Sequence, residues 1–345
     1  MSFAYIHPEF RLNSRSFATA DDLIHAVDDT MTKQFLQAWF NEEDVLNVQT
    51  SGSTGTPTTI QLLKQHMINS AYASGTYFKL PAQTRALCCL STSYIAGKMM
   101  WVRALTLGWQ LDVVTPSNHP LEGTRQVYDF TAMVPVQVQN SLRKLRQVRT
   151  LIVGGAAVSK MLIEQLKMTN TRVYATYGMT ETSTHIAIRN LKLKSTAYQV
   201  LPNVTIAVDQ RGCLVIYAPH LFNGRIITND LVKIKSAKSF EWLGRYDGVI
   251  NSGGVKLIPE QIEAKLGEVI QRRFFVAGIP DVEWGEKLVL IIEGERLPQL
   301  EQQLAALASL HKYEIPKQVC YVPAFVETHT GKVQRKSSLD LALAQ

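Results

Sequence analysis

A loop rich in glycine and hydroxyl residues is the first segment of this chain that could do chemistry. It consists of Thr50, Ser51, Gly52, Ser53, Thr54 and Gly55, and Thr56 and Pro57 follow it. Small residues let backbone N–H groups approach phosphate oxygens closely, and the hydroxyl groups add further donors. Because no Gly-Lys-Ser/Thr follows at the required spacing, the loop is not a Walker motif. It indicates a phosphate-binding loop, and a flexible hairpin is the alternative.

A second segment comes directly after a predicted strand and contains Tyr177, Gly178, Met179, Thr180 and Glu181. Its turn presents Thr180 and Glu181 together. The Glu181 carboxylate could hold a Mg²⁺ ion that bridges phosphate oxygens, and Thr180 could donate to a phosphate. Taken alone, the same pair could simply cap a helix.

Two further positions have side chains suited to nucleotide chemistry. Asp230 follows Thr228 and Asn229, and Arg245 comes shortly before Asp247. An aspartate can accept both hydroxyls of a ribose, and an arginine beside it would add donors, although a surface salt bridge is the alternative. Lys332 lies in a Thr-Gly turn near the C-terminus, where a lone lysine seldom has a catalytic role.

The order and spacing of these segments resemble the adenylate-forming superfamily of acyl-CoA synthetases, adenylation domains and luciferases, from about residue 48 to residue 336. TSGSTGTPT is similar to the phosphate loop of that superfamily, and YGMTET to its adenine and magnesium motif. The segment that flanks the adenine is matched by Gly154, Gly155 and Ala156. The resemblance implies ATP and Mg²⁺ as cofactors, with the metal on Glu181, and the ribose on Asp230 and Arg245.

The resemblance also extends to the C-terminal part of the chain. TGKVQRK is similar to the catalytic-lysine motif, which implies that Lys332 contacts the carboxylate and the α-phosphate. GRYDGVINSGGVKLIP implies a hinge at Asp247 and a loop at Ser252, Gly253 and Gly254 that leaves room for the pantetheine arm of coenzyme A. The implied reaction forms an acyl-adenylate with release of pyrophosphate and then a thioester. The alternatives are another acceptor, such as a carrier protein, or a non-catalytic homologue that binds a nucleotide or acyl ligand.

The segment LSTSYIAGKMM resembles the one that lines the acyl pocket, which implies that Tyr94 and Lys98, with Gly178, face the acid. Such short chains are similar to o-succinylbenzoate–CoA ligases of menaquinone biosynthesis. Lys98 and Arg103 could pair with a second substrate carboxylate, or they could only cap and solubilise their helix. The phosphate loop lacks the usual lysine after its proline, and Lys64 is one conceivable substitute.

Short apolar runs alternate with helical patterns, which predicts an α/β fold with a large layered N-terminal domain over 1–245. A smaller, mobile α+β domain is expected over 246–345. The predicted strands cover 45–49, 85–90, 111–114, 151–153 and 173–176. The predicted helices cover 21–39, 64–78, 98–107, 136–145 and 159–167.

The chain has 345 residues and a formal net charge of +7, without a concentrated basic face, so a nucleic-acid partner is not expected. No run of 18 or more apolar residues predicts a membrane span, and the N-terminus does not read as a signal peptide. Its four cysteines show no metal spacing and fit a reducing cytoplasm. The expected partner is a small carboxylic acid, and the protein is expected to be a monomer or a homodimer.

Overall fold

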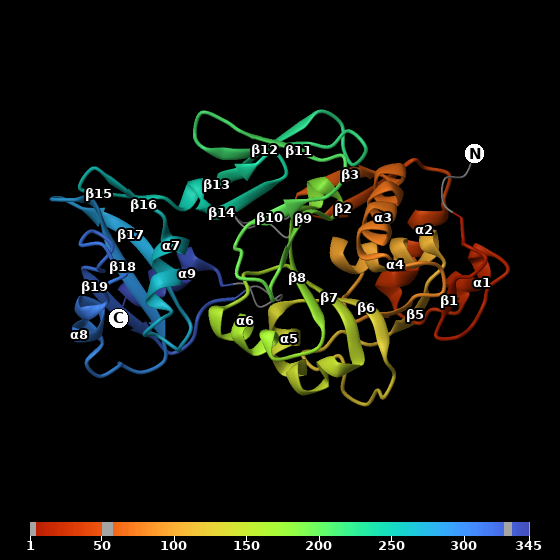
Figure 1. The fold of residues 1–345 in the computed structure, drawn as a ribbon, viewed down its shortest axis with the longest axis horizontal. Helices are drawn as coiled ribbons and strands as arrows, with labels where there is room; N and C mark the ends of the chain where they lie inside the picture. Colours follow the sequence, from red (N-terminus) through yellow and green to blue (C-terminus); the bar gives the residue numbers. More distant parts are fainter. Residues whose placement is uncertain (1–4, 50–57, 328–332, 345) are drawn as a thin grey trace. The chain divides into compact units, whose positions relative to one another are not determined.

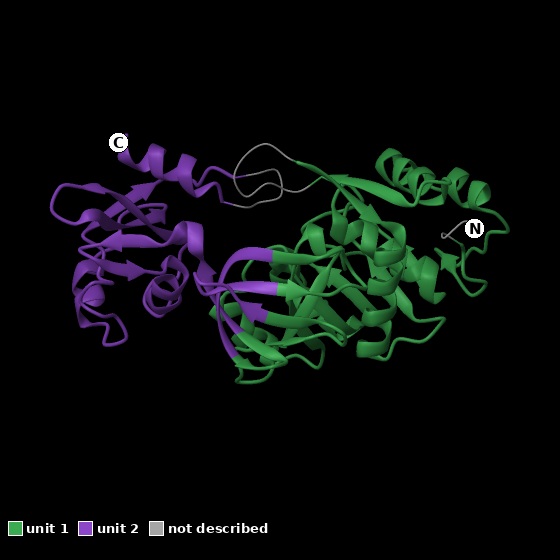
Figure 2. Cartoon of the chain, turned by 90° about the horizontal axis from the view of Figure 1, so that it is seen from above, with its two compact units in different colours: residues 1–206, 216–226, 235–240 green, residues 207–215, 227–234, 241–345 purple. Residues whose placement is uncertain are grey.

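The structure is a computed structural model that describes residues 5–49, 58–327 and 333–344. The chain packs into two compact units, which Figure 2 shows in green and purple. Unit 1 comprises residues 1–206, 216–226 and 235–240. Unit 2 comprises residues 207–215, 227–234 and 241–345. The division therefore separates a large N-terminal body from a smaller C-terminal one, with two short strand segments of the middle region assigned to the smaller unit.

Unit 1 is built on a sheet in which strands β5, β4, β6, β7 and β8 are parallel neighbours, and β6 to β8 lie side by side in Figure 1. The strand order is β1-β5-β4-β6-β7-β8-β9-β10, and a separate pair is formed by β2 and β3. The strands are β1 Arg11–Leu12, β2 Val45–Gln49, β3 Thr59–Leu63, β4 Arg85–Cys88, β5 Gln110–Val113, β6 Tyr128–Met133, β7 Val148–Val153, β8 Arg172–Gly178, β9 His185–Asn190 and β10 Tyr198–Val200.

The apolar side chains of these strands divide between the two faces of the sheet. Leu151 and Val153 of β7 join one core cluster, whereas Ile152 between them joins the other. This alternation is the two-residue period of a strand, and burial on both faces explains why residues 151–153 are all apolar. Cys88 and Cys89 are buried and free, as expected for core residues. Burial raises the pKa of these thiols to about 11 and about 12.

The helices of unit 1 are α1 Ala20–His25, α2 Thr30–Phe40, α3 Lys64–Phe78, α4 Ile95–Leu107, α5 Pro135–Ser141 and α6 Lys160–Lys167. The single helix predicted over 21–39 is wrong, because the chain forms two. Asp29 accepts a hydrogen bond from the backbone N–H of Thr32 at 2.7 Å and so caps a new helix. The helix predicted over 136–145 is likewise α5 followed by the 3₁₀ segment η1 Leu142–Gln147.

Four strands of the middle region follow β10 in the sheet order β14-β13-β12-β11. They are β11 Thr205–Val208, β12 Cys213–Tyr217, β13 Arg225–Ser236 and β14 Ser239–Arg245. All four strands contain residues of both units.

The C-terminal part of unit 2 is a sheet with the order β16-β15-β18-β17, and β19 pairs with β18. Its elements are β15 Ile250–Ser252, β16 Val255–Leu257, α7 Pro259–Leu266, β17 Phe274–Asp281, β18 Gly285–Glu293, α8 Leu300–Ala306, β19 Gln318–Val322 and α9 Arg335–Leu343. The short 3₁₀ segment η3 Tyr246–Gly248 links β14 to β15. Helix α7 packs on β17, and its start at Pro259 agrees with the sequence, since proline is favoured in a first helical turn.

The predicted α/β class, with one large sheet and a smaller α+β body, is confirmed. Among the helices that the structure describes, none combines the length and hydropathy needed to cross a membrane.

Candidate active site

The candidate site of unit 1 begins where β7 and β8 end. Because these neighbours are parallel, their C-terminal ends lie at the same edge of the sheet. Gly154 and Gly155 directly follow β7, and Gly155 has a φ of +83°, which favours glycine. A Cβ atom on Gly154 would lie 2.5 Å from Thr176 Oγ1 of β8. The glycines therefore let the loop that also contains Ala156 turn closely over the end of β8.

Gly178 ends β8 at a second close approach of two backbones. A Cβ atom here would collide with the carbonyl oxygen of Thr184 and the Cα of His185. The pairing of β8 with β9 shifts register between Tyr177 and Gly178. A side chain at Gly178 is therefore excluded, and the chain can turn sharply out of the sheet at this point.

The segment after Gly178 forms the 3₁₀ turn η2 Thr180–Thr182, which places Thr180 and Glu181 on one short loop. The turn is fastened by Thr182, whose hydroxyl accepts from the Met179 N–H at 3.0 Å and donates to the Thr184 carbonyl at 2.5 Å. Glu181 is exposed, and within residues 5–49, 58–327 and 333–344 no hydrogen bond or ion pair of its carboxylate occurs. The carboxylate is thus open to a cation.

Tyr177 is held by aromatic neighbours. Its ring meets Phe240 edge-on, with ring centroids 5.1 Å apart, and Tyr198 at 5.9 Å. Tyr198 and Phe240 in turn stack at 5.7 Å. Such a cluster fixes the orientation of the Tyr177 ring before any ligand arrives.

The predicted acyl-pocket segment forms the start of helix α4. Tyr94 occupies the N-cap position, and Gly97 packs so closely on the Ser91 carbonyl that any Cβ would collide with it. The Lys98 ammonium turns back to donate to the Thr92 carbonyl and lies 5.6 Å from the centre of the Phe35 ring. Burial lowers the pKa of Lys98. Lys98 therefore fastens the turn before its own helix.

Arg103 of the same helix is in a different environment. It is only 1% exposed, so it does not solubilise the helix. One guanidinium nitrogen donates to Thr184 Oγ1 at 3.0 Å, and another lies 3.9 Å from Met100 Sδ. The Nε atom has no hydrogen-bond partner among the described residues, and no carboxylate among them pairs with the charge. Burial lowers the pKa of Arg103 to about 10, so the group still carries its charge at neutral pH.

His185 lies next to this buried cation. Its Nδ1 is 3.2 Å from Thr184 Oγ1, and its Nε2 has no partner among the described residues. Burial and the charge of Arg103 lower the pKa of His185 to about 3. Unit 1 therefore holds, behind the end of β8, one buried cation and one neutral imidazole with unused hydrogen-bonding capacity.

The candidate site of unit 2 brings Asp230, Arg245 and Asp247 together. Asp230 is 7% exposed, and its Oδ1 lies 3.8 Å from Arg245 NH1. Arg245 forms two hydrogen bonds with Asp247, of 3.0 Å from Nε and 2.7 Å from NH2. These hydrogen bonds are the main reason that the pKa of Asp247 is lowered. The predicted ribose pair and the predicted hinge residue are therefore neighbours in one charged cluster.

The glycine turn expected to meet coenzyme A is a hairpin between β15 and β16. Ser252 pairs with Val255, so the turn consists of Gly253 and Gly254. Their φ angles are +58° and +79°, as a two-residue turn of this type requires. The Gly253 N–H donates to the Trp284 carbonyl at 2.8 Å, and a Cβ on Gly253 would meet the Trp284 ring. The turn thus needs both glycines for reasons of conformation and space.

Some predicted site residues lie outside the described residues, namely Thr50, Ser51, Gly52, Ser53, Thr54 and Gly55 of the phosphate loop and Lys332. Lys64, considered as a substitute for the missing loop lysine, is described, and its geometry speaks against that role. Its side chain is 1% exposed and donates to the carbonyl oxygen and Oδ1 of Asn41, at 2.9 and 2.7 Å. Lys64 therefore ties helix α2 to helix α3 and is not presented to a phosphate.

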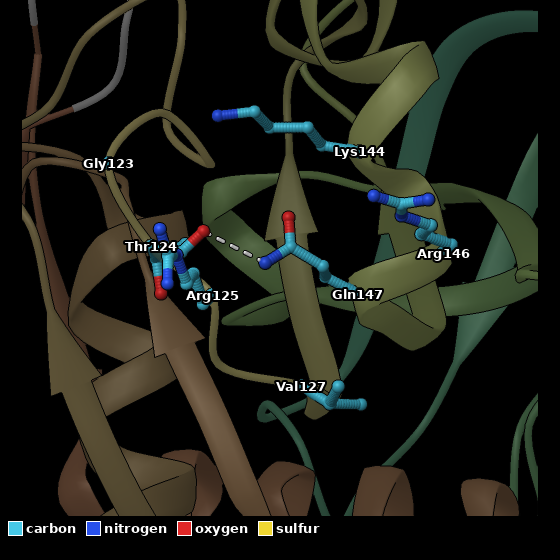
Figure 3. A pocket seen from close by; sticks show the side chains of 7 residues that line it. All are labelled: Gly123, Thr124, Arg125, Val127, Lys144, Arg146 and Gln147. Atoms are coloured by element: carbon cyan, nitrogen blue, oxygen red, sulfur yellow. Dashed lines mark hydrogen bonds between the residues drawn. The ribbon is translucent and has the colours of Figure 1, made fainter.

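A hollow of about 650 Å³ lies at the opposite edge of the sheet (Figure 3). It is formed by residues that precede β6 and β7, with Arg125, Lys144 and Arg146 among them. Gln147 donates to the Thr124 carbonyl at 2.9 Å and so ties the segment before β7 to the segment before β6. Since the predicted site residues follow the other ends of these strands, this hollow does not belong to the candidate site.

For several residues of the two sites the sequence indicated no role. Trp242 donates from its indole N–H to Asp230 Oδ1 at 3.1 Å, and Thr228 accepts from the Asp230 N–H at 3.1 Å. Thr184 and His185 complete the surroundings of Arg103. Thr184 and His185 directly follow the YGMTET motif, so their place near the site could have been suspected. The contact of Trp242 depends on strand pairing, which the sequence does not reveal.

Comparison with known proteins gives consistent matches. The solved structure of an acyl-CoA synthetase (AMP-forming)/AMP-acid ligase II-like protein from Dyadobacter fermentans is 36% identical, covers 90% of this chain and 93% of that one, and has a TM-score of 0.60. The 2-succinylbenzoate–CoA ligase of Listeria monocytogenes is 26% identical over 90% of this chain and 73% of that protein.

A third match concerns the fold alone. The o-succinylbenzoate coenzyme A synthetase of Bacillus subtilis, solved with ATP and a magnesium ion, has a TM-score of 0.74 at 20% identity, over 85% of this chain and 69% of that one. The sequence model described as AMP-binding enzyme matches residues 8–224, which is more than half of the chain. The superfamily resemblance that the motifs suggested is thereby confirmed: the chain belongs to the AMP-binding enzyme family.

Proposed function

We propose that this protein is an AMP-forming acid–thiol ligase that converts o-succinylbenzoate to its coenzyme A thioester, a step of menaquinone biosynthesis. The acid attacks the α-phosphate of ATP, which forms an acyl-adenylate and releases pyrophosphate. The thiol of coenzyme A then attacks the acyl carbonyl and displaces AMP. Family membership and relatives whose names specify 2-succinylbenzoate support both steps.

We assign each part of the nucleotide to its own set of residues. In unit 1, Gly154, Gly155 and Ala156 flank the adenine, and the fixed Tyr177 ring supplies an apolar face to it. In unit 2, Asp230 accepts the ribose hydroxyls and Arg245 donates beside it. The loop from Thr50 to Gly55, which lies outside the described residues, receives the phosphates.

Magnesium fits the surroundings of Glu181. Mg²⁺ is commonly bound by one or two carboxylates and completes its shell with phosphate oxygens and water. Glu181 offers one exposed carboxylate without a partner among the described residues, and no cluster of three metal-binding side chains occurs among them. When bound, the ion neutralises phosphate charge. Thr180 donates to a phosphate oxygen beside it.

Lys332 provides the cation that lets an anionic acid approach a polyanionic phosphate. We assign it to the first step, and the smaller domain, residues 246–345, then rotates about Asp247. That rotation removes Lys332 and presents Ser252, Gly253 and Gly254 to the pantetheine arm. Two successive glycines leave this turn without side chains, which supports the assignment.

The choice of a dicarboxylic substrate depends on one observation, the buried charge of Arg103. A guanidinium removed from water costs several kcal/mol unless an anion or several acceptors compensate for it. Among the described residues it has one hydroxyl, one sulfur and no carboxylate. The second carboxylate of the substrate would supply the missing acceptors and could form a bidentate pair. Lys98, which donates to the Thr92 carbonyl, contributes less to this recognition.

A panel of carboxylic acids tests the proposal. Purified protein is given ATP, Mg²⁺ and each acid, and AMP production is measured with and without coenzyme A. We expect AMP production that depends on coenzyme A and is fastest with o-succinylbenzoate. Acid-dependent pyrophosphate release that coenzyme A does not accelerate would point to another acceptor, such as a carrier protein. No acid-dependent release with any acid would contradict the proposed reaction.

The remaining features are consistent with small-molecule metabolism. ATP and coenzyme A are metabolites of the cytoplasm, and we place the enzyme there. We assign it no nucleic-acid or membrane partner and expect a monomer or a homodimer, which sedimentation measurements would determine.

A further inference from the structure

We infer that Trp242 is a positioning residue that orients Asp230 toward the ribose and thereby contributes to the choice of ribonucleotide over deoxyribonucleotide. This inference rests on the proposed function, in which Asp230 accepts the ribose hydroxyls. It assigns a role to a side chain that lies three residues before Arg245 on β14.

The geometry at Asp230 supports a direct role for the indole. The Trp242 N–H donates to Asp230 Oδ1 at 3.1 Å, whereas the nearest guanidinium nitrogen of Arg245 is 3.8 Å away. At 3.8 Å the arginine contributes charge attraction but no normal hydrogen bond. The indole is therefore a donor that can set the plane of the carboxylate about the Cβ–Cγ bond.

The backbone of Asp230 is fixed independently. Its N–H donates to Thr228 Oγ1 at 3.1 Å, and the same hydroxyl donates to the Leu214 carbonyl at 2.9 Å. With the main chain held by Thr228, the remaining freedom of Asp230 is the rotation of its side chain. The Trp242 contact acts on that rotation, which decides where the carboxylate lone pairs point.

Arg245 cannot fill this role alone, because Asp247 competes for it. Both hydrogen bonds between Arg245 and Asp247 are short, at 3.0 and 2.7 Å. The Trp242 N–H carries no charge and belongs to a strand, so its contact with Asp230 does not depend on the state of Asp247.

A misoriented aspartate would weaken contacts with the ribose hydroxyls and leave contacts with the base and phosphates unchanged. The loss should therefore be large for ATP and small for 2′-deoxyATP and 3′-deoxyATP, each of which lacks one hydroxyl. This pattern separates positioning from a general loss of structure, which would weaken the binding of all three nucleotides alike.

The test compares nucleotide binding by calorimetry, which does not require turnover. Trp242→Phe keeps an aromatic ring and removes the donor. We expect the Kd for ATP to rise about tenfold, the effect of one hydrogen bond to a charged group, and the Kd values for the two deoxynucleotides to rise no more than about twofold. The preference of the protein for ATP should shrink accordingly.

Two further variants control this experiment. Trp242→His replaces the indole with an imidazole whose Nε2–H occupies a similar position, so it should retain most of the preference for ATP. Trp39→Phe removes a buried indole N–H that has no partner among the described residues and should leave the preference unchanged. In an Asp230→Asn background, Trp242→Phe should have little additional effect on the preference, because both changes act through the same carboxylate.

The outcomes separate the inference from the proposed function. If Trp242→Phe keeps the wild-type preference, or weakens the binding of all three nucleotides equally, the inference is wrong while the ligase activity can stand. Equal binding of ATP and both deoxynucleotides by the wild type would also overturn it. Nucleotide preference that changes as expected in a protein without acid-dependent pyrophosphate release would instead contradict the proposed function.

Discussion

The two candidate sites bury opposite charges and differ in how far neighbouring protein groups compensate them. In unit 1, Arg103 is almost fully buried and has no carboxylate partner among the described residues. In unit 2, the Asp230 carboxylate is also buried, but Trp242 and Arg245 lie within 3.1 and 3.8 Å of it. The difference supports the roles we propose, in which Asp230 accepts from neutral ribose hydroxyls and Arg103 pairs with an anionic ligand.

The largest expected effect is on the rate of acyl-adenylate formation. It tests the cation that we assign to Lys332 of unit 2, as distinct from recognition of the acid by Arg103 of unit 1. We expect Lys332→Ala to lower the rate of acyl-adenylate formation by about 10²–10³, because it removes a cation from the transition state. Thioester formation from a supplied acyl-adenylate should change little. Pyrophosphate exchange and thioester assays measure the two steps, and adenylation near the wild-type rate would exclude the role assigned to Lys332.

The second expected effect concerns stability and has opposite signs in the two units. Asp230→Ala leaves the Trp242 N–H without its acceptor and should lower the free energy of unfolding by about 1–3 kcal/mol. Arg103→Met removes an uncompensated buried charge and should raise it by about 1 kcal/mol. Urea unfolding followed by tryptophan fluorescence measures both. A clear loss of stability in Arg103→Met would show that the charge is already compensated in the free protein.

The third expected effect is a pH dependence that originates beside Arg103. His185 has a pKa of about 3 in the folded protein, whereas the ordinary value of a histidine is 6.5. The unfolded chain therefore binds a proton that the folded chain does not, so the stability from this group is complete above pH 6.5 and is lost as the pH falls toward 3. By pH 5 the loss amounts to about 2 kcal/mol.

Variants of two histidines isolate this contribution. His185→Gln should lose less stability between pH 7 and pH 5 than the wild type, as measured by urea unfolding at each pH. His119→Gln, at an exposed position, should behave as the wild type does. Identical pH profiles for His185→Gln and the wild type would mean that His185 is not buried as a neutral group.

Local sequence patterns were enough to predict the strands, the helix and the turn that position the candidate site residues. The apolar run LIV predicted β7, because buried parallel strands are often continuously apolar, and residues 173–176 predicted β8. Helix α3 begins and ends where it was expected. The segment TNDL and the GRYDG segment pointed to Asp230 and Arg245, which the fold does bring together. The turn of Gly253 and Gly254 also follows from residue type, since both residues need positive φ angles.

Features that depend on packing between distant segments could not be predicted. The start of α2 depends on the Asp29 cap, which interrupts a pattern that reads as one helix. Lys98 and Arg103 lie five positions apart on one helix, yet their environments differ. Lys98 donates to the turn before the helix, whereas Arg103 is buried against Thr184 in the connection between β8 and β9. Strand β6 has the sequence YDFTAM, which mixes polar and apolar residues. Only its parallel pairing with β4 and β7 identifies it as a strand. The contact of Trp242 with Asp230 likewise requires the pairing of β13 with β14.

The most direct measurement compares o-succinylbenzoate with two monocarboxylic analogues, 3-benzoylpropionate and 2-butyrylbenzoate, in wild type, Arg103→Met and the exposed control Arg143→Met. The wild type and the control should prefer the dicarboxylate by about 10²-fold in kcat/KM, the effect of a charge-assisted pair. In Arg103→Met the preference should fall below about tenfold, with activity on the better analogue retained. An undiminished preference for the dicarboxylate in Arg103→Met would contradict the assignment of the buried guanidinium to the second carboxylate.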